Sequence, residues 1–511
     1  MQGTEEKGGD STPRQHFPEQ FLKGIALSVW QNSSDTASNW TEFAQRKNYF
    51  GQGTYKDAFL KANDFWTEYE NDIKLMKNLG ATSFRFSFEW ARFAPDGPGQ
   101  VDPSAVAKFH QILDCCEAYG LEPCATLFHF TVPQWFEARG GFAVEENLPL
   151  FVDYCTMVFQ NYGHRIRLWA TMNEPTCFAF VGYICGIWAP GKFLRLTEAG
   201  TVLCNLLKAH CAVYRALKEL PGGLKACIGL VHQHIMFEPG SNWWHIRELC
   251  KWMTFWFGTN LVLDFFKTGT FSWASPFSSQ VKTLHVDEGI KAGEVVVDWW
   301  GINYYSRPVM HWNFAMGASS ANERVTDTNF RLHPQGLYDS IRDASALGVP
   351  MYITETGLAD AKDQHREHFI RSHYSMILKA IHDGFDVRGV FFWTLMDNIE
   401  WHEGFRVKFG LYRWDPEYAA HHAGSNGRPP NGLELRKGAL AHATCPDDLH
   451  SLRVFAAAHH HHLQVHATRP DNLHSLRAFA AAHHHRNSTC YLARQSAQSE
   501  GICCRAPTPE Q

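Results

Sequence analysis

Eight short apolar segments recur between residues 21 and 415, and longer amphipathic segments separate them. Several of the apolar segments are nearly continuous hydrophobic runs, as expected for parallel strands that are covered on both faces. The predicted strands are Gly24–Trp30, Thr82–Phe88, Cys124–Phe130, Leu168–Asn173, Ala226–His232, Val297–Asn303, Met351–Glu355 and Gly389–Thr394. Helical patterns between them include Ala62–Leu79, Ser104–Tyr119, Leu148–Tyr162, Thr197–Leu220 and Gln364–His382.

This alternation predicts an α/β fold, a (β/α)8 TIM barrel with long βα loops. A doubly wound open sheet is the alternative for a chain of alternating strands and helices. That fold normally carries a glycine-rich turn after its first strand. The segment after Trp30 has no such turn, so the barrel is the favoured prediction.

The two ends of the chain differ in composition from this central region. We predict a disordered N-terminal segment at 1–17, the barrel at 18–440 and a weakly ordered His/Ala-rich tail at 441–511. A unit that begins at His442 recurs at His466, but two copies are too few for a repeat fold. The histidine runs of the tail resemble expanded low-complexity sequence, so no metal site is predicted.

Charge and hydropathy exclude several classes of partner. A net charge of −5 and the absence of a basic cluster argue against nucleic acid. The apolar run Trp252–Phe266 is too short to span a bilayer and contains Asn260 and Asp264, so no transmembrane segment is expected. The fourteen cysteines form no CxxC pair, and no secretory signal is seen, which favours the cytosol. The oligomeric state is left open.

Two glutamates follow apolar strands in matching contexts. Glu174 ends the run Leu168–Glu174, and Glu355 ends the run Met351–Glu355. The carboxyl ends of barrel strands meet at one rim, where catalytic groups are presented. Two carboxyl groups can flank one glycosidic bond there, with retention when they lie about 5–5.5 Å apart and inversion at about 6.5–9.5 Å. Sequence spacing does not choose between these distances.

The chain resembles glycoside hydrolase family 1, the β-glucosidase family, over about residues 21–415. Thr171–Pro175 is similar to the family's Thr-x-Asn-Glu-Pro motif, and Ile353–Gly357 to its Ile-Thr-Glu-Asn-Gly motif, with Thr356 in place of Asn. The resemblance implies a retaining hydrolase of β-D-glucosides, or of β-D-galactosides or β-D-fucosides, that needs no cofactor. Glu355 would attack the anomeric carbon, and Glu174 would act as acid and then as base.

The resemblance also implies residues that support the two carboxyl groups. Asn173 would hold the sugar's 2-hydroxyl. Arg85 would lie beside Glu355 and keep it ionised. Tyr305 would donate to the same carboxylate, with Asn303 nearby.

A second set would bind the sugar ring. Gln31, at the end of the first strand, would bond the 3- and 4-hydroxyls, and His129 matches the family's strand-three histidine. Glu400 would hold the 4- and 6-hydroxyls, which argues against a phosphorylated sugar. Trp393 and Trp401 would form an indole floor for the ring.

Some positions depart from the family pattern. Phe130 stands where a Trp usually follows the histidine, and Asn32 follows Gln31 where relatives carry a short apolar-Glu-Gly sequence. Phe330 lies in the region of an aglycone-stacking Trp and is the candidate for that role. Each supporting residue also has a purely structural interpretation, such as core packing or an interior ion pair.

Two alternatives remain at this stage. Gly229–His234, Tyr183–Trp188 and Phe392–Thr394 resemble a plant galactolipid:galactolipid galactosyltransferase, a branch that transfers galactose to a sugar or glycolipid acceptor. An inactive sugar-binding protein is the alternative from another class. Because both Glu174 and Glu355 are present, hydrolysis is the favoured prediction.

Overall fold

The computed structural model describes residues 16–47, 61–274, 281–285, 296–313, 315–317, 323–415 and 433–444. Most of the predicted N-terminal segment and the tail from 445 onwards lie outside these residues. The domain limits at 17 and 441 therefore stay predictions. Helix α16 (Leu440–Thr444) continues past the predicted end of the barrel, and its His442 is buried against Tyr374.

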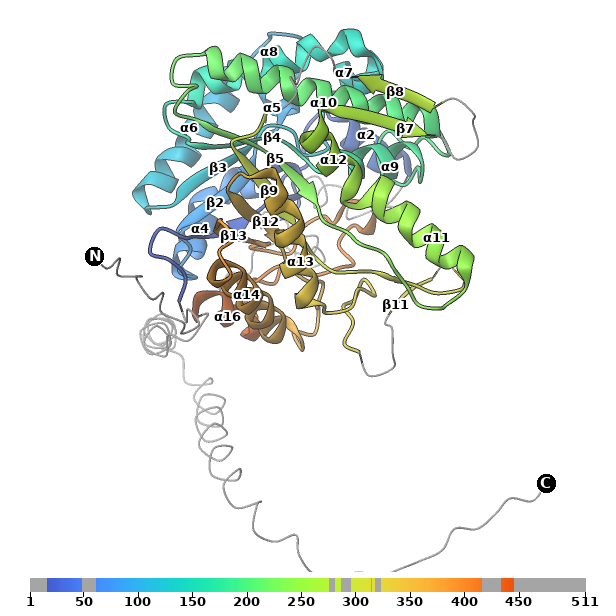
Figure 1. The fold of residues 1–511 in the computed structure, drawn as a ribbon. Coiled ribbons are helices and arrows are strands. Elements are labelled where there is room, and N and C mark those ends of the chain that lie inside the picture. Colours follow the sequence, from blue (N-terminus) through green and yellow to red (C-terminus); the bar gives the residue numbers. More distant parts are fainter. Residues whose placement is uncertain are drawn as a thin grey trace, which may run out of the picture. The chain divides into compact units, whose positions relative to one another are not determined.

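The central feature is a closed barrel of parallel strands with helices around it (Figure 1). The strands follow the order β1-β13-β12-β9-β5-β4-β3-β2. Barrel strands that follow one another along the chain therefore lie side by side. They are β1 Leu22–Ala26, β2 Ser83–Ser87, β3 Glu122–Thr126, β4 Leu168–Asn173, β5 Cys227–Gln233, β9 Trp299–Asn303, β12 Met351–Thr356 and β13 Val387–Trp393. The prediction of a (β/α)8 barrel is confirmed.

The helices that connect these strands pack around the barrel (Figure 1). The longer ones are α4 Phe65–Asn78, α6 Pro103–Ala118, α8 Leu148–Tyr162, α10 Leu196–Glu219, α13 Pro334–Ala344 and α14 Arg366–His382. Local chemistry fixes their starts. Asp102 caps α6 by accepting the Ser104 amide at 2.8 Å, with Pro103 at the first position, and His333 caps α13 in the same way ahead of Pro334.

The core of the barrel is built by strand side chains. Strands β2, β4, β9 and β12 are buried at every position, which explains why their sequences read as continuous rather than alternating. One buried cluster contains Trp299, Tyr352 and Phe391, together with Trp393 at the end of β13. Trp393 therefore links the packed interior to the rim above it.

Two sequence predictions need correction. The first strand ends at Ala26, and Gln31 lies in the short helix α1 (Val29–Asn32) that follows it. The third strand ends at Thr126, so His129 also lies beyond its strand. In both places the apolar run continues into a buried rim segment, which hydrophobicity alone does not distinguish from a strand.

The loop after β5 is long and carries structure of its own. It contains β6 (Glu238–Pro239), α11 (Trp244–Met253), α12 (Asn260–Thr268) and the hairpin of β7 (Thr270–Ala274) and β8 (Val281–His285). Strand β6 pairs with β10 (Val309–Met310), which also pairs with β11 (Met316–Gly317). Among the residues that the structure describes, none of the helices is long and apolar enough to cross a bilayer.

Candidate active site

The predicted functional side chains meet at the rim formed by the carboxyl ends of the barrel strands. Glu174 follows β4, Glu355 lies in β12 and Asn303 ends β9. Glu174 has a left-handed backbone (φ 42°) and is followed at once by helix α9 (Pro175–Tyr183). A non-glycine residue in this region is uncommon, and the sharp change from strand to helix carries the carboxyl group into the site.

A pocket with about 720 Å³ of empty space, part of it open to solvent, lies at this rim. Its lining includes nine of the twelve predicted residues: His129, Asn173, Glu174, Tyr305, Phe330, Glu355, Trp393, Glu400 and Trp401. The other three, Gln31, Arg85 and Asn303, hydrogen-bond to carboxyl groups of the lining.

Glu355 is held by two donors. Arg85 Nη1 lies 2.6 Å from Oε1, and the Tyr305 hydroxyl donates to Oε2 at 2.7 Å. The Arg85 and Glu355 side chains are 2% and 5% exposed, so water does not screen this ion pair. Charge-assisted bonds of this kind stabilise and orient a carboxylate. Glu355 is thus prepared as an ionised group with a fixed direction.

Glu174 lies in a different environment. It is buried and accepts a hydrogen bond from Asn303 Nδ2 at 2.7 Å. Burial, followed by the charge of Glu355, raises the pKa of Glu174 to about 7, against smaller opposing effects of Asn303, Cys177 and Arg85. A carboxyl group with such a pKa carries its proton near neutral pH and can give it away.

Asn173 connects these groups. Its amide oxygen accepts from Arg85 at 2.8 Å and from Asn303 at 3.1 Å, and its nitrogen lies 3.3 Å from Nε2 of His129. Burial and then the charge of Arg85 lower the pKa of His129 well below its ordinary value. His129 is therefore neutral, and one of its ring nitrogens can accept from Asn173.

Glu400 forms a second polar centre. Trp393 Nε1 donates to Oε1 at 3.0 Å, and Gln31 Nε2 lies 3.4 Å from Oε2 and 2.7 Å from the Ile399 carbonyl. Burial raises the pKa of Glu400 to about 8. The amide oxygen of Gln31 is buried and has no protein partner among the described residues. These groups offer acceptors for the hydroxyls of a bound sugar.

Aromatic rings close the pocket around these polar groups. Trp401 stacks on Trp30 with 5.5 Å between centroids, and the Phe130 ring contacts both Trp401 and Trp188. The His129 ring lies parallel to Trp393 at 5.9 Å. Such flat, partly apolar surfaces suit the C–H face of a pyranose ring.

The pocket contains residues to which the sequence assigned no role. They are Phe130, Trp188, Thr326, Thr328, Gly357, Leu358, Ala359 and Phe409. Most of them lie on βα loops, where no periodicity marks which side chains face inwards. Cys177 was also missed, although its position three residues after Glu174, at the start of a helix, gave a signal that it shares a face with that carboxyl group.

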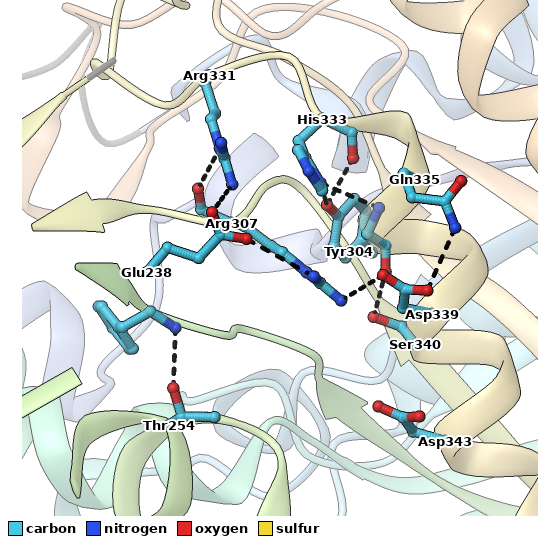
Figure 2. Close-up of polar contacts among 12 residues, drawn as sticks. Glu238, Thr254, Tyr304, Arg307, Arg331, His333, Gln335, Asp339, Ser340 and Asp343 are labelled. Atoms are coloured by element: carbon cyan, nitrogen blue, oxygen red, sulfur yellow. Dashed lines mark hydrogen bonds and ion pairs between the residues drawn. The ribbon is translucent and has the colours of Figure 1, made fainter. Parts of the chain in front are cut away.

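A second charged cluster joins β6 to the loop after β9 and to α13 (Figure 2). Glu238 of β6 contacts both Arg307 and Arg331, and Arg307 Nη2 also pairs with Asp339 of α13 at 2.7 Å. Arg331 Nη1 lies 3.3 Å from Glu323. We call these five residues the arginine network. It lies next in sequence to two pocket residues, because Arg331 follows Phe330 and Arg307 lies two positions after Tyr305.

Comparison with known proteins agrees with this geometry. The sequence profile described as glycosyl hydrolase family 1 matches residues 13–422. A 1,4-beta-D-glucan glucohydrolase of Thermotoga neapolitana is 27% identical over 417 residues, which cover 77% of this chain and 97% of the relative. The solved beta-glycosidase from Pyrococcus horikoshii is 31% identical with a TM-score of 0.72, covering 86% of this chain and 98% of that structure.

A ligand-bound structure is also similar. The beta-glucosidase from Thermotoga maritima in complex with glucoimidazole is 25% identical, with a TM-score of 0.70, and covers 84% of this chain and 98% of that structure. None of the three relatives named here is a galactosyltransferase, so the resemblance to that branch finds no support from them.

Proposed function

We propose that this chain, which belongs to glycosyl hydrolase family 1 and is a retaining β-glycosidase, acts on β-D-glucosides with Glu355 as nucleophile and Glu174 as acid/base. The observation that carries the assignment of roles is the unequal environment of the two carboxyl groups. Arg85 and Tyr305 both donate to Glu355, whereas Glu174 is buried beside that charge and has a raised pKa.

In the first step an oxygen of the Glu355 carboxylate attacks the anomeric carbon. The bond from that carbon to the aglycone oxygen breaks, and Glu174 transfers its proton to the departing oxygen. The products of this step are the free aglycone alcohol, an ester between Glu355 and the sugar, and an ionised Glu174. Arg85 and Tyr305 hold Glu355 in the direction of attack.

In the second step water attacks the same carbon from the side that the aglycone left. Glu174 takes one proton from the water, the ester bond breaks and Glu355 leaves as a carboxylate. Two inversions give net retention of configuration. The charge of Glu355 is one cause of the raised pKa of Glu174. Since esterification removes that charge, Glu174 becomes a stronger acid in the intermediate and stays ionised as the base.

The gluco-configured sugar is proposed from the polar centre around Glu400. Glu400, Gln31 and Trp393 place a carboxyl group, an unpartnered amide oxygen and an indole within one buried cradle. A sugar with an unsubstituted 6-hydroxyl can donate to Glu400, whereas a phosphate would be repelled by it once ionised. The names of the relatives from the two Thermotoga species point to the same sugar.

The test is intact mass after incubation with an activated 2-deoxy-2-fluoro-β-glucoside, followed by peptide mapping. One fluoroglucosyl group on Glu355 is the expected result. An adduct on another residue would refute the nucleophile assignment. An adduct only with the galacto-configured analogue would keep the mechanism and overturn the choice of sugar.

A further inference from the structure

Cys177 lies in the first turn of α9, three residues after Glu174, with 8% of its surface exposed. Its thiol contacts two acceptors. It donates to the amide oxygen of Gln233, and it also lies within hydrogen-bonding reach of the Glu174 carboxyl group. A thiol has one proton, so it can serve only one of these acceptors at a time.

Gln233 is a fixed partner. It is buried at the end of β5, and its amide nitrogen donates to the Phe257 carbonyl at 2.6 Å. That bond leaves the amide oxygen to face Cys177. Gln233 is also paired in register with Asn303, the residue that donates to Glu174. The acid/base is thus held between one permanent donor and one thiol that has another acceptor available.

We propose that Cys177 is a positioning residue for the acid/base. The thiol of Cys177 donates a hydrogen bond to Gln233 while Glu174 is protonated, and to the Glu174 carboxylate once Glu174 has lost its proton. The proposal rests on the assignment of Glu174 as acid/base. The charged acceptor is the stronger one, so the thiol turns to Glu174 only when Glu174 is ionised. No covalent bond forms or breaks in this exchange.

A thiol suits this position because it is a weak donor. A second strong permanent donor, in addition to Asn303, would stabilise the carboxylate further and leave Glu174 with too little tendency to hold its proton for the first step. Without any donor, the carboxylate of the glycosyl-enzyme intermediate would keep only the bond from Asn303. Cys177 therefore supports the ionised form modestly and without opposing the protonated one.

The experiment compares the pH dependence of kcat/KM for an alkyl β-D-glucoside, whose poor leaving group requires the proton of Glu174. The basic limb of that profile reports the free enzyme's acid. Cys177→Ala removes the donor, and the limb moves to higher pH. Cys177→Ser supplies a stronger donor, and Gln233→Met frees the thiol for Glu174, so both move it to lower pH. Each shift should be roughly half a pH unit, the size expected for one neutral hydrogen bond.

Two controls separate the possible failures. Cys250→Ser changes a buried thiol on α11 and should leave the limb in place. Glu174→Gln should remove the limb. If it does not, the limb belongs to another group, and both the acid/base assignment and the role of Cys177 fall. If the limb depends on Glu174 but none of the three variants moves it, Cys177 is only a packing residue and this proposal alone is overturned.

Discussion

The segment that follows β9 contributes Tyr305 to the pocket and Arg307 to the arginine network, and these two groups of charged residues are paired differently. In the pocket, the Arg85 guanidinium pairs with Glu355 and lies near enough to Glu174 to act on its charge, whereas Glu400 is held by the neutral donors Trp393 and Gln31. In the arginine network, each guanidinium reaches at least two carboxylates, and Glu238 lies between the two arginines (Figure 2).

This difference in charge pairing suits the pocket to proton transfer and the arginine network to holding loops in place. Burial, followed by the charge of neighbouring carboxylates, raises the pKa values of Glu174 and Glu400 to about 7 and about 8. Groups with such values change their protonation under working conditions. The network instead joins β6, the loop after β9 and α13, and each of its carboxylates is paired with at least one guanidinium. Its variants should change geometry, and pocket variants should change chemistry.

The largest effect is expected for Glu355→Ala. Without the nucleophile, turnover should fall by a factor on the order of 10⁴–10⁶, as for other enzymes that lose their nucleophile. Azide should fit the space left by the carboxyl group and convert an activated β-glucoside to the α-glucosyl azide. The measurement is turnover with and without azide, with NMR of the product. Normal turnover, or formation of the β-glucosyl azide, would refute the assignment of Glu355 as nucleophile.

A smaller and selective effect is expected for Glu174→Ala. Substrates with poor leaving groups should lose about 10²–10⁴-fold in kcat/KM, whereas activated aryl glucosides should keep their first step. In the intact enzyme the acid form of Glu174 is lost as pH rises through about 7, so activity on alkyl glucosides should fall there. Leaving-group dependence and the pH profile are the measurements. An equal loss for all leaving groups would contradict the role.

Glu400→Gln should separate binding from stability. The amide loses one charge-assisted contact to the sugar, so kcat/KM should fall about 10–100-fold. The folded protein holds the Glu400 proton more tightly than the unfolded chain, because burial raises its pKa from 4.5 to about 8. This group's contribution to stability is therefore lost as pH rises between those values, whereas glutamine stays neutral.

The stability effect of Glu400→Gln has a defined sign. At pH 8 the variant should exceed the intact protein in free energy of unfolding by about 1–3 kcal/mol, and the gain should shrink at pH 5. Thermal unfolding at both pH values tests it. A variant that is less stable at pH 8 would show that Glu400 is compensated as fully as the carboxylates of the network.

The sequence predicted the barrel strands and most of the pocket residues. The strands are buried on both faces, so their apolar runs marked all eight barrel strands, and the polar residues that end β4, β9 and β12 identified the site. Gln31 was placed in a strand because buried rim segments have the same composition as strands. The cytosolic location and the weakly ordered tail stay predictions.

The sequence could not predict the arginine network, the place of Trp188 in the pocket or the contact between Cys177 and Gln233. Glu238 and Arg331 lie 93 positions apart, and only the long loops after β5 and β9 bring them together. Cys177 was one of fourteen cysteines, and its acceptor Gln233 comes from another strand. Contacts of this kind depend on tertiary structure, because no local periodicity records them.

The smallest effect on catalysis, and the sharpest test of the comparison, is expected for Arg331→Met. The change removes the ion pairs of Arg331 with Glu238 and Glu323, so the free energy of unfolding should fall by about 1–3 kcal/mol. The loop that carries Phe330 loses its side-chain attachment to Arg307, because Arg331 Nε donates to the Arg307 carbonyl at 3.0 Å, and keeps only the bond from the Ser306 hydroxyl to the main-chain carbonyl of residue 331. KM should therefore rise several-fold.

The same variant should keep kcat within about twofold and leave both limbs of the pH profile in place, since none of the pocket carboxyl groups is altered. Arg342→Met is the matched control. It removes a 54% exposed guanidinium of α13 that also pairs with Asp339, and such surface pairs contribute at most about 1 kcal/mol. If Arg331→Met moved a pH limb, the network's charge would act on the pocket carboxyl groups, and the two clusters would form one electrostatic unit.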